Sequence, residues 1–572
     1  MITIKINDKE FKVKEDITIL EAAGNNKVEI PTLCYLKDVN EIASCRICLV
    51  EVKGSNKLLP ACVTKVKEGM EIYTETDKVV NARKMNLELI MSNHNKDCDS
   101  CKRNGNCELQ LLVNKYQIEE ENHFESKIDT STTSIVRDNS KCILCNRCVK
   151  ACKNIQGIAV IGRNGRGFDT HIGCAFDKDL KDVPCILCGQ CILACPTGAL
   201  TEKDDTEKVF EALNNKDLHV VVGVAPSVRV TLGEEFNFPI GTNVKGKMVN
   251  ALRQLGFDKV FDVNFGADLT VMEEANELLD RINNNGTLPM FTSCSPGWIK
   301  YVEQYYPEMI SHLSTCKSPQ QMFGAIIKTY YAEKYNIDPK KIVVVSVMPC
   351  IAKKYEMTRD YQNASGYNDI DIVITTRELA RMIRKMKIGF RDLEDQEFDM
   401  PLGIGASAIF GSTGGVMEAA LITAVEILTG KKLEKLEFNE VRGTKGIKEA
   451  TYNVNGKDIK VAVVSGIKNA KTILEKIKNK EVDYQFVEFM TCPGGCINGG
   501  GQPIVEAEVR NTTDYIKLRM DALLEEDKNL PIRKAHENPV IIELYKNYLE
   551  KPNSKKAHEI LHTKYSKKEK YQ

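Results

Sequence analysis

The sequence lacks the features that direct a protein to membranes or nucleic acids. No stretch approaches the roughly 18 consecutive apolar residues that a transmembrane helix requires, and the 79 basic and 79 acidic residues cancel. A neutral chain has no charge-driven attraction to nucleic acid or to a membrane surface. Residues 1–11 lack the basic and apolar regions of a secretory signal peptide. We therefore expect a soluble, cytoplasmic protein with no nucleic-acid or membrane partner.

A nucleotide-binding loop is also missing. No GxGxxG pattern stands between an expected strand and an expected helix, so direct use of NAD(P)H is not expected. The segment Gly411–Gly415 is glycine-rich but has no lysine for a phosphate. A close approach of the backbone to a cofactor explains these glycines better.

Cysteine, in contrast, is abundant. The chain has 572 residues, enough for about three to five domains, and 21 cysteines. In a reducing compartment, closely spaced cysteines indicate metal or redox chemistry rather than disulfides. All but Cys174, Cys294 and Cys316 fall into spaced groups, and tight C-x2-C repeats favour iron–sulfur clusters over zinc.

Residues 1–78 begin with a predicted hairpin, in which Ile2, Ile4 and Ile6 alternate before a turn at Asn7-Asp8. Thr18 is expected to cap a short helix. Cys34, Cys45, Cys48 and Cys62 follow. A tight group of three cysteines with one distant cysteine is typical of plant-type [2Fe–2S] ferredoxins, but here a longer gap separates Cys34 from Cys45. The segment resembles the [2Fe–2S] domain of respiratory and hydrogenase subunits, with a zinc ribbon as the alternative. The expected ligands are Cys34, Cys45, Cys48 and Cys62.

Residues 79–125 contain a histidine at ligand spacing from three cysteines. The set is His94, Cys98, Cys101 and Cys107. Such a set can hold zinc or a [4Fe–4S] cluster with one nitrogen ligand. Spacing alone does not separate the two, and the position between two ferredoxin-like segments favours the cluster.

Residues 126–209 contain two copies of the bacterial two-cluster ferredoxin run. In that run the fourth cysteine of each copy ligates the other cluster. The first [4Fe–4S] cluster is therefore expected on Cys142, Cys145, Cys148 and Cys195, and the second on Cys185, Cys188, Cys191 and Cys152. Cys174, between the copies, has no spacing partner and is expected to be inert.

Residues 210–572 alternate between strand-like and helical patterns after a polar connector at 204–218. This alternation predicts an α/β domain with mostly parallel strands. Strands are expected at 218–224, 259–263, 287–291, 341–347, 369–375, 460–465 and 484–489, and helices at 247–255, 271–282, 377–386 and 470–477. Three of these strands lead into cysteine-bearing loops, at 292–298, 348–353 and 490–496. Sites in open α/β sheets gather beyond the carboxyl ends of strands, so the three loops are expected to converge on one soft-metal site.

These loops resemble the TSCCP-x-W, MPC-x2-K and M-x-C-x-GGC motifs of the [FeFe]-hydrogenases, and the order of segments resembles the monomeric clostridial members. The resemblance extends to Ala557–His562 in a C-terminal segment like the family's small subunit. It implies that Cys350, Cys492 and Cys496 bind the [4Fe–4S] half of the family's H-cluster, with Cys496 bridging to a diiron subsite that carries CO, cyanide and a dithiolate. By the same resemblance, the groups around that subsite are Pro226, Ser227, Gln320, Lys353, Met348 and Met490.

The resemblance also implies a proton path. It runs from Cys294 through Glu274, Ser314 and Glu277 to Arg281. The last two residues have the spacing of an ordinary i,i+4 ion pair on a helix face, which is the alternative interpretation. Trp298 is expected to be a core anchor.

One position departs from the family pattern, because the fourth cubane ligand of TSCCP is Ser295 here. A hydroxyl gives up its proton less readily than a thiol and is a harder ligand. Ser295 could ligate, Cys294 could ligate in its place, or one iron could keep no side-chain ligand.

The resemblance implies reversible conversion of two protons and two electrons to H2. The expected cofactors are one [2Fe–2S] cluster, three accessory [4Fe–4S] clusters and the H-cluster, whose diiron subsite requires maturation proteins. The expected electron carrier is a ferredoxin or flavodoxin. Two alternatives are a hydrogen sensor of low turnover and an iron–sulfur electron-transfer protein without the diiron subsite.

Overall fold

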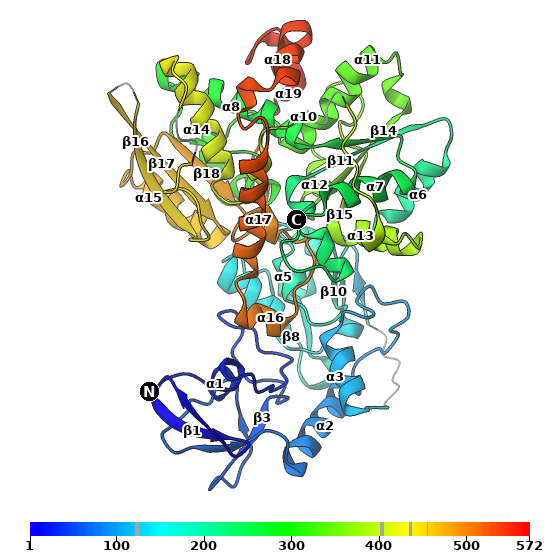
Figure 1. Cartoon of the computed structure of the whole chain (residues 1–572), viewed down its shortest axis with the longest axis vertical. Coiled ribbons are helices and arrows are strands. Elements are labelled where there is room, and N and C mark those ends of the chain that lie inside the picture. Colours follow the sequence, from blue (N-terminus) through cyan, green and yellow to red (C-terminus); the bar gives the residue numbers. More distant parts are fainter. Residues whose placement is uncertain (120–125, 401–404, 434–436, 455, 572) are drawn as a thin grey trace. The chain divides into compact units, whose positions relative to one another are not determined.

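The computed structural model describes residues 1–119, 126–400, 405–433, 437–454 and 456–571, shown in Figure 1. The chain divides into two compact units. The first contains residues 1–183, 190–201 and 505–513, and the second contains residues 184–189, 202–504 and 514–572. The expected segment ends at 125 and 572 lie outside the described residues. Among the described helices, none is both long enough and apolar enough to cross a membrane.

The first unit begins with the predicted hairpin. Strands β1 (Ile2–Ile6) and β2 (Lys9–Val13) pair antiparallel, and Asn7 and Asp8 in the turn both have positive φ. Thr18 caps α1 (Ile19–Asn25) in a capping box with Glu21, as predicted. The hairpin belongs to a five-stranded sheet of order β2-β1-β5-β3-β4. Its other strands are β3 (Leu49–Val52), β4 (Leu59–Pro60) and β5 (Glu71–Tyr73).

The other cysteines of this unit lie mostly in loops between helices and short strands. Helices α2 (Asp77–Met91) and α3 (Glu108–Tyr116) flank the His94 group. The hairpins β6 (Ile128–Asp129)–β7 (Ile135–Asp138) and β8 (Ile161–Asn164)–β9 (His171–Cys174) follow. Helices α4 (Arg147–Lys150) and α5 (Gln190–Ala194) each begin next to a C-x2-C turn, and α16 (Ala507–Thr512) completes the unit.

The described residues of the second unit form two sheets. One has the order β12-β11-β14-β15 and is entirely parallel, with strands β11 (His219–Val224), β12 (Lys259–Asp262), β14 (Ile342–Met348) and β15 (Ile372–Thr375). Its core includes apolar side chains of α7 (Lys245–Leu255), α10 (Pro319–Ile326) and α13 (Thr376–Lys385). Val221 and Val222 are fully buried, as expected for a strand that is covered on both faces.

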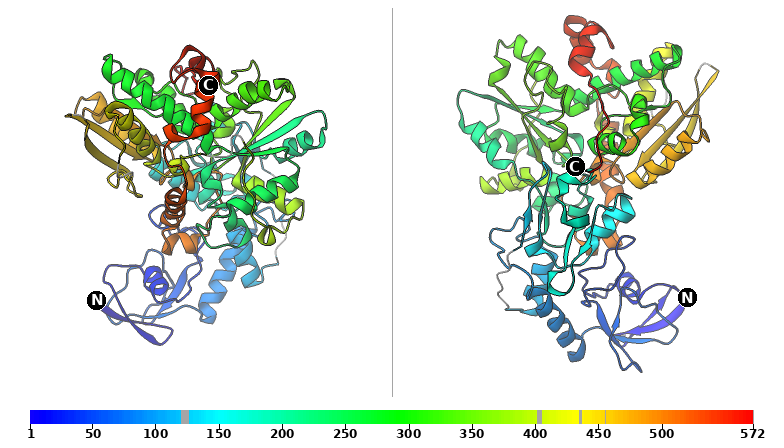
Figure 2. Two further views of the ribbon diagram at one scale, coloured as in Figure 1. Left: turned by 45° about the horizontal axis from the view of Figure 1, so that its top comes forward. Right: turned by 180° about the vertical axis from the view of Figure 1, so that it is seen from behind.

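The other sheet has the order β13-β18-β17-β16. Strands β13 (Met290–Phe291), β18 (Phe486–Met490) and β17 (Lys457–Ser465) are parallel, whereas β16 (Ile447–Val454) pairs antiparallel with β17. This hairpin was not predicted, because β16 alternates polar and apolar residues weakly. Helices α8 (Asn264–Asn283) and α14 (Gly415–Thr429) pack on β17 and β18 through one apolar cluster, and α15 (Ile467–Lys478) packs against β17 (Figure 2).

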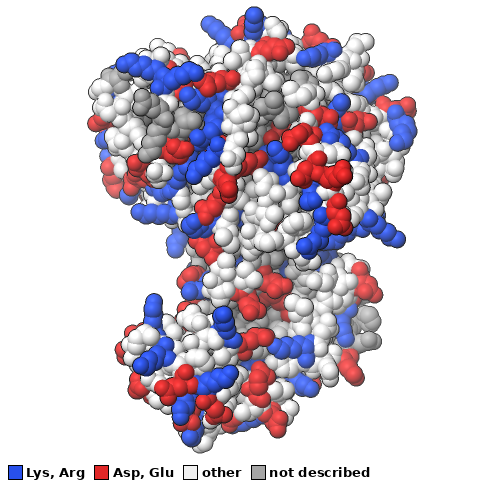
Figure 3. Space-filling view, viewed as in Figure 1, with Lys and Arg blue, Asp and Glu red and all other residues white. Residues whose placement is uncertain are grey.

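The remaining helices of this unit connect or cover the two sheets. The predicted polar connector contains α6 (Thr206–Asn214). The others are α9 (Pro296–Tyr305), α11 (Ala332–Lys334), α12 (Lys353–Glu356), α17 (Tyr515–Asn529), α18 (Pro539–Leu544) and α19 (Lys555–Leu561). On the face that Figure 3 shows, basic and acidic side chains are interspersed, in keeping with the zero net charge.

Candidate metal centre

In the second unit, the carboxyl ends of strands from both sheets lie next to one cavity. The loops after β11, β13, β14 and β18 all line it. The cavity contains about 840 Å³ of space between atoms, including space open to solvent, and its lining is mostly apolar. The predicted convergence of the three cysteine loops is therefore confirmed by the geometry.

The lining includes every residue that the resemblance assigned to the cubane or to the surroundings of the diiron subsite, together with the first residue of the proton path. These are Pro226, Ser227, Cys294, Ser295, Gln320, Met348, Cys350, Lys353, Met490, Cys492 and Cys496. Cys188, a predicted ligand of the second ferredoxin cluster, also lines this cavity.

Two features of this cavity fit a bound metal–sulfur group. Ser227 Oγ and Gln320 Oε1 are buried without a hydrogen-bond partner among the described residues. Burial raises the pKa of the Cys350 thiol, and burial together with Cys350 raises that of Cys496 to about 12. Bound metal ions deprotonate coordinating thiols, and their positive charge would stabilise the thiolates in this apolar cavity.

The Cys496 loop requires glycine at two positions. Gly494 and Gly495 have φ of +80° and +97°, which favours glycine. A Cβ on Gly495 would lie 2.6 Å from the backbone nitrogen of Thr413. In the Gly411–Gly415 segment only Gly411 and not Gly414 lines the cavity. At Gly414 a Cβ would lie 2.1 Å from Val441 O, so contact with the protein backbone explains that glycine.

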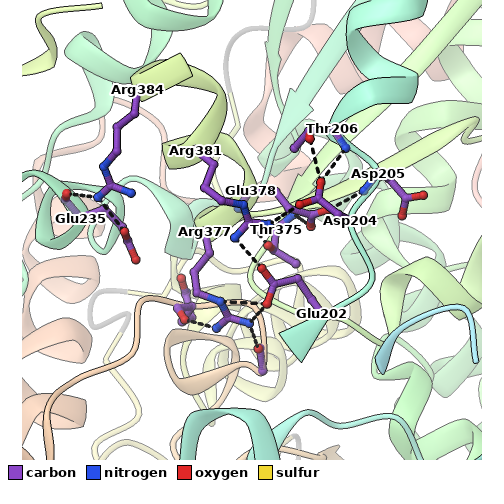
Figure 4. A network of polar contacts seen from close by, with 12 residues as sticks. Glu202, Asp204, Asp205, Thr206, Glu235, Thr375, Arg377, Glu378, Arg381 and Arg384 are labelled. Atoms are coloured by element: carbon purple, nitrogen blue, oxygen red, sulfur yellow. Dashed lines mark hydrogen bonds and ion pairs between the residues drawn. The ribbon is translucent and has the colours of Figure 1, made fainter. Parts of the chain in front are cut away.

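An arginine that the sequence did not single out ties the same loop to a neighbouring helix. Arg377, on α13, donates to the carbonyl oxygens of Gln502 at 2.5 Å and Gly500 at 2.8 Å, and also to Glu202. Figure 4 shows this network, in which Glu202 also accepts from Arg381. Because Gly501 N donates to Pro349 O at 2.7 Å, the cysteine loops of Cys350 and Cys496 are joined directly.

Lys353 is held by a carboxylate at the edge of the cavity. Its Nζ lies 2.9 and 2.8 Å from the two oxygens of Glu356 and donates to Cys294 O at 3.0 Å. Glu356 also accepts from Gln320 Nε2 at 3.1 Å. Sequence reasoning missed Glu356, although its i,i+3 spacing from Lys353 was a usable signal.

Hydrogen bonds connect some of the predicted proton-path residues but not all of them. Ser314 Oγ donates to Glu277 Oε2 at 2.9 Å, and Arg281 donates to Glu277 Oε1 at 2.6 Å. Neither oxygen of Glu274 has a hydrogen-bond partner among the described residues. Burial and the charge of Glu277 raise the pKa of Glu274 to about 8. Burial and Glu274 raise the pKa of Cys294 well above its usual value.

Trp298 is fully buried, as predicted. Its ring stacks on Phe489 with centroids 3.9 Å apart, and its Nε1 donates to Thr292 O at 3.1 Å. Thr292 Oγ1 in turn accepts from Phe489 N. The loop that carries Cys294 is thereby fixed to strand β18.

Two cavities in the first unit are lined by predicted ligand sets. One of about 380 Å³ contains Cys142, Cys145, Cys148 and Cys195. Another of about 270 Å³ contains His94, Cys98, Cys101 and Cys107. Burial lowers the pKa of His94 to about 4, and its Nδ1 has no partner among the described residues, so this imidazole is neutral and has a lone pair for a metal.

For the other predicted ligand sets, the structure shows only some of the contacts among their members. Sγ of Cys48 lies 3.3 Å from Sγ of Cys62, and Cys34 interacts with Cys45. Cys152 and Cys191 belong to the first unit, and Cys185 and Cys188 to the second, so their common cluster stays a prediction. Cys174 is buried and contacts Arg137 at 3.6 Å.

Comparison with known families agrees with this arrangement. Residues 218–500 match the iron only hydrogenase large subunit, C-terminal domain, and residues 513–568 the iron hydrogenase small subunit. Residues 1–77 match a 2Fe-2S iron-sulfur cluster binding domain. Residues 83–122 match the NADH-ubiquinone oxidoreductase-G iron-sulfur binding region, and residues 132–201 the ferredoxin-like domain of NADH-quinone oxidoreductase subunit 3.

Individual relatives cover the whole chain. The chain is 47% identical to the NADP-reducing hydrogenase subunit HndD of Solidesulfovibrio fructosivorans, over 100% of this chain and 99% of that protein. It is 47% identical to iron hydrogenase 1 of Clostridium pasteurianum, over 99% and 100%. A solved [FeFe]-hydrogenase from Chlamydomonas reinhardtii superposes with a TM-score of 0.57 and 40% identity, covering 64% of this chain and 99% of that one. The chain belongs to the iron-only hydrogenase family.

Proposed function

We propose that this protein interconverts H2 with protons and electrons at an H-cluster bound in the 840 Å³ cavity. The observation that supports this most strongly is the convergence of Cys294, Cys350, Cys492 and Cys496 with Lys353 and Gln320 on that cavity. A plain [4Fe–4S] site needs only the cysteines. The added thiol, lysine and amide support the hydrogenase over the electron-transfer alternative.

When bound, the H-cluster supplies the making and breaking of the H–H bond, and the protein supplies position, protons and electrons. Cys350, Cys492 and Cys496 would hold its cubane. Ser227 Oγ and Gln320 Oε1, which lack partners among the described residues, would meet its polar ligands. Lys353 can donate charge-assisted hydrogen bonds there, while Met348 and Met490 line the apolar walls.

Protons would move along Cys294, Glu274, Ser314, Glu277 and Arg281. Two of the links are hydrogen bonds of 2.9 Å and 2.6 Å. Glu274, with a pKa of about 8, holds its proton near neutral pH and can release it at small cost. A relay group works best when its pKa lies near the operating pH.

Electrons would move through the accessory clusters. We assign one [2Fe–2S] cluster to residues 1–78, one His-ligated [4Fe–4S] cluster to 79–125 and two [4Fe–4S] clusters to 126–209. The H-cluster and a small-subunit-like segment are assigned to 210–572. Cys188 lines the main cavity, and this supports electron entry from the second ferredoxin cluster.

The external carrier is a ferredoxin or flavodoxin in the cytoplasm, and the diiron subsite is built by maturation proteins. The similarity to HndD over the full length supports a second candidate, in which the chain is one subunit of an assembly that reduces NADP. Reduction of purified ferredoxin by H2 with the single chain supports ferredoxin as the carrier. NADP reduction only after partner chains are added supports the assembly that reduces NADP.

The test of activity is anaerobic H2 evolution from reduced viologen by the matured protein, beside Ser295→Cys. Substantial turnover of the unmodified chain supports the enzyme and shows that Ser295 is tolerated. Activity only in Ser295→Cys places a defect at that ligand. No turnover in either protein, with the CO and cyanide infrared bands present, rejects the enzyme and supports a hydrogen sensor.

A further inference from the structure

A second cluster of metal-ligating side chains lies outside the main cavity, in the second unit. Ligand atoms of Glu277, Cys316 and His562 all lie within 4.8 Å of one another. Sγ of Cys316 is 3.6 Å from Oε2 of Glu277. Cys316 is fully buried, His562 is 8% exposed, and the side chain of Glu277 is 12% exposed.

The backbone fixes these residues in place. Cys316 and His562 face each other in an antiparallel bridge. On either side of it, Lys317 N donates to Leu561 O and Thr563 N donates to Thr315 O, each at 2.8 Å. Glu277 projects from α8. A site that is held by packed elements is preorganised, so little ordering is needed when a ligand binds.

The donor set is one thiol, one imidazole and one carboxylate, which is a zinc set. Thr315 Oγ1 contacts both Nδ1 of His562 at 2.7 Å and Oε2 of Glu277 at 3.4 Å, so Nδ1 is the nitrogen on the Glu277 side. A cation bound to Nδ1 would take the place of this hydroxyl. The other nitrogen, Nε2, lies 3.1 Å from Oε2 of Glu273. A carboxylate on the far nitrogen of a ligating histidine is the usual support of a zinc ligand.

Charge at the cluster also suits a divalent cation. Arg281 donates to Oε1 of Glu277, whereas Oε2 accepts from Ser314 and from Thr315 N and lies nearer to Cys316. Burial and the neighbouring carboxylates Glu277, Glu274 and Glu273 raise the pKa of the Cys316 thiol well above its usual value. Without a cation the thiol keeps its proton. One Zn²⁺ would enter as that proton leaves, and the sulfur would bind as thiolate.

An exposed imidazole marks an entry to this site. His558 is exposed, and its ring centroid lies 3.9 Å from that of His562. His558 lies on α19, and His562 follows the end of that helix in extended backbone, with the two rings next to each other. His558 can therefore receive a cation from solvent and pass it to the buried ligands.

We propose that Glu277, Cys316 and His562 form a Zn²⁺ site that blocks the proton path when it is filled. This proposal rests on the proposed function, because Glu277 is the residue through which protons would leave. A cation on Oε2 of Glu277 would displace the hydroxyl of Ser314, which donates to that oxygen at 2.9 Å. Zinc would thus stop H2 turnover without touching the metal centre.

A similar but weaker group serves as a control. Glu426, His536 and Glu537 also cluster, but Lys534 and Lys432 each lie 2.7 Å from one of their carboxylates, and the group has no thiol. His536→Gln and Cys174→Ala are therefore matched controls for the histidine and the cysteine of the proposed site.

The binding test uses the anaerobic holoenzyme with ZnCl2, followed by desalting, metal analysis and zinc X-ray absorption. We expect one zinc per chain with sulfur, nitrogen and oxygen ligands. Cys316→Ala and His562→Gln should each weaken binding at least tenfold, and the two controls should not. Equal zinc retention in Cys316→Ala, or a shell of sulfur alone, would overturn the site. This readout does not depend on hydrogenase activity.

The activity test measures H2 evolution against ZnCl2 concentration, with each variant normalised to its own zinc-free rate. We expect inhibition that a chelator reverses, at a zinc concentration at least tenfold higher in Cys316→Ala. Zinc binding with the expected ligands but no inhibition would overturn the block. If the zinc-free protein has no activity, the proposed function fails, and the binding test alone decides the metal site.

Discussion

The hydroxyl of Ser295 lies 2.7 Å from Oγ1 of Thr491, the residue directly before Cys492, and also accepts from Thr491 N at 3.3 Å. The serine that replaces the family's fourth cubane cysteine is thus engaged with the protein. Ligation of iron by Ser295 would require its hydroxyl to lose a proton, which a hydroxyl gives up less readily than a thiol. Of the three arrangements that the sequence leaves open, we expect a cubane without a ligand at this position, because the hydroxyl already has partners in Thr491.

We therefore predict that Ser295→Ala keeps the iron of the cubane. A ligand that makes no bond to iron can be removed without loss of metal, whereas loss of Cys350 removes one of three thiolates. Iron analysis and electron paramagnetic resonance of the two variants, loaded with the cubane alone, test this. Loss of cubane iron in Ser295→Ala equal to that in Cys350→Ala would show that Ser295 ligates.

Glu274→Gln should lower H2 turnover at least 100-fold. The amide cannot accept and release a proton, and general acid–base groups contribute about 10²- to 10⁴-fold to rates. Steady-state rates at pH 7 test this, with Asp280→Asn as the control, since Asp280 is exposed on the same helix. A rate of Glu274→Gln within threefold of the parent would remove Glu274 from the proton path.

The pH dependence of stability should also report Glu274. Burial raises its pKa from about 4.5 to about 8, so between these values the folded state holds a proton that the unfolded state has lost. The contribution of Glu274 to the free energy of unfolding is therefore largest below pH 4.5. It falls by about 1.4 kcal/mol per pH unit as the pH rises to 8. Unfolding midpoints of the parent and Glu274→Gln should diverge across this window, with the parent losing stability faster. Parallel curves would contradict the raised pKa.

Glu356→Gln should destabilise the fold and slow turnover at least tenfold. Lys353 would lose a carboxylate at 2.8 Å, and both side chains are largely buried. Breaking such a pair costs about 3–5 kcal/mol because a buried charge is left unpaired. Thermal unfolding tests the stability and viologen assays test the rate.

The control for that change is Glu308→Gln. Glu308 pairs with Lys478 at 3.2 Å, and both side chains are about half exposed. Exposed pairs contribute no more than about 1 kcal/mol. Equal losses of stability in the two variants would show that the burial of Lys353 and Glu356 does not matter.

Local patterns in the sequence were sufficient for the elements that carry the site. The alternation of Ile2, Ile4 and Ile6 predicted the first hairpin, and the valine run at 220–224 predicted β11. These signals are local because burial on one or both faces of a strand leaves a period in the sequence. The β16 hairpin was missed because it pairs at the edge of its sheet, where such a period is weak.

The sequence by itself was sufficient to recognise the family and the strands that end in cysteine loops, and it predicted the cysteine sets, because ligand chemistry demands particular residues at short, fixed spacings. Only the tertiary structure showed which other residues form hydrogen bonds with the residues of the site. Thr491 holds Ser295, Glu356 holds Lys353, and Arg377 holds the loop beyond Cys496. These partners come from other segments or turns, and a hydrogen bond between such residues leaves no period in the sequence. For the same reason, the sequence did not indicate the group of Glu277, Cys316 and His562, which come from three separate segments.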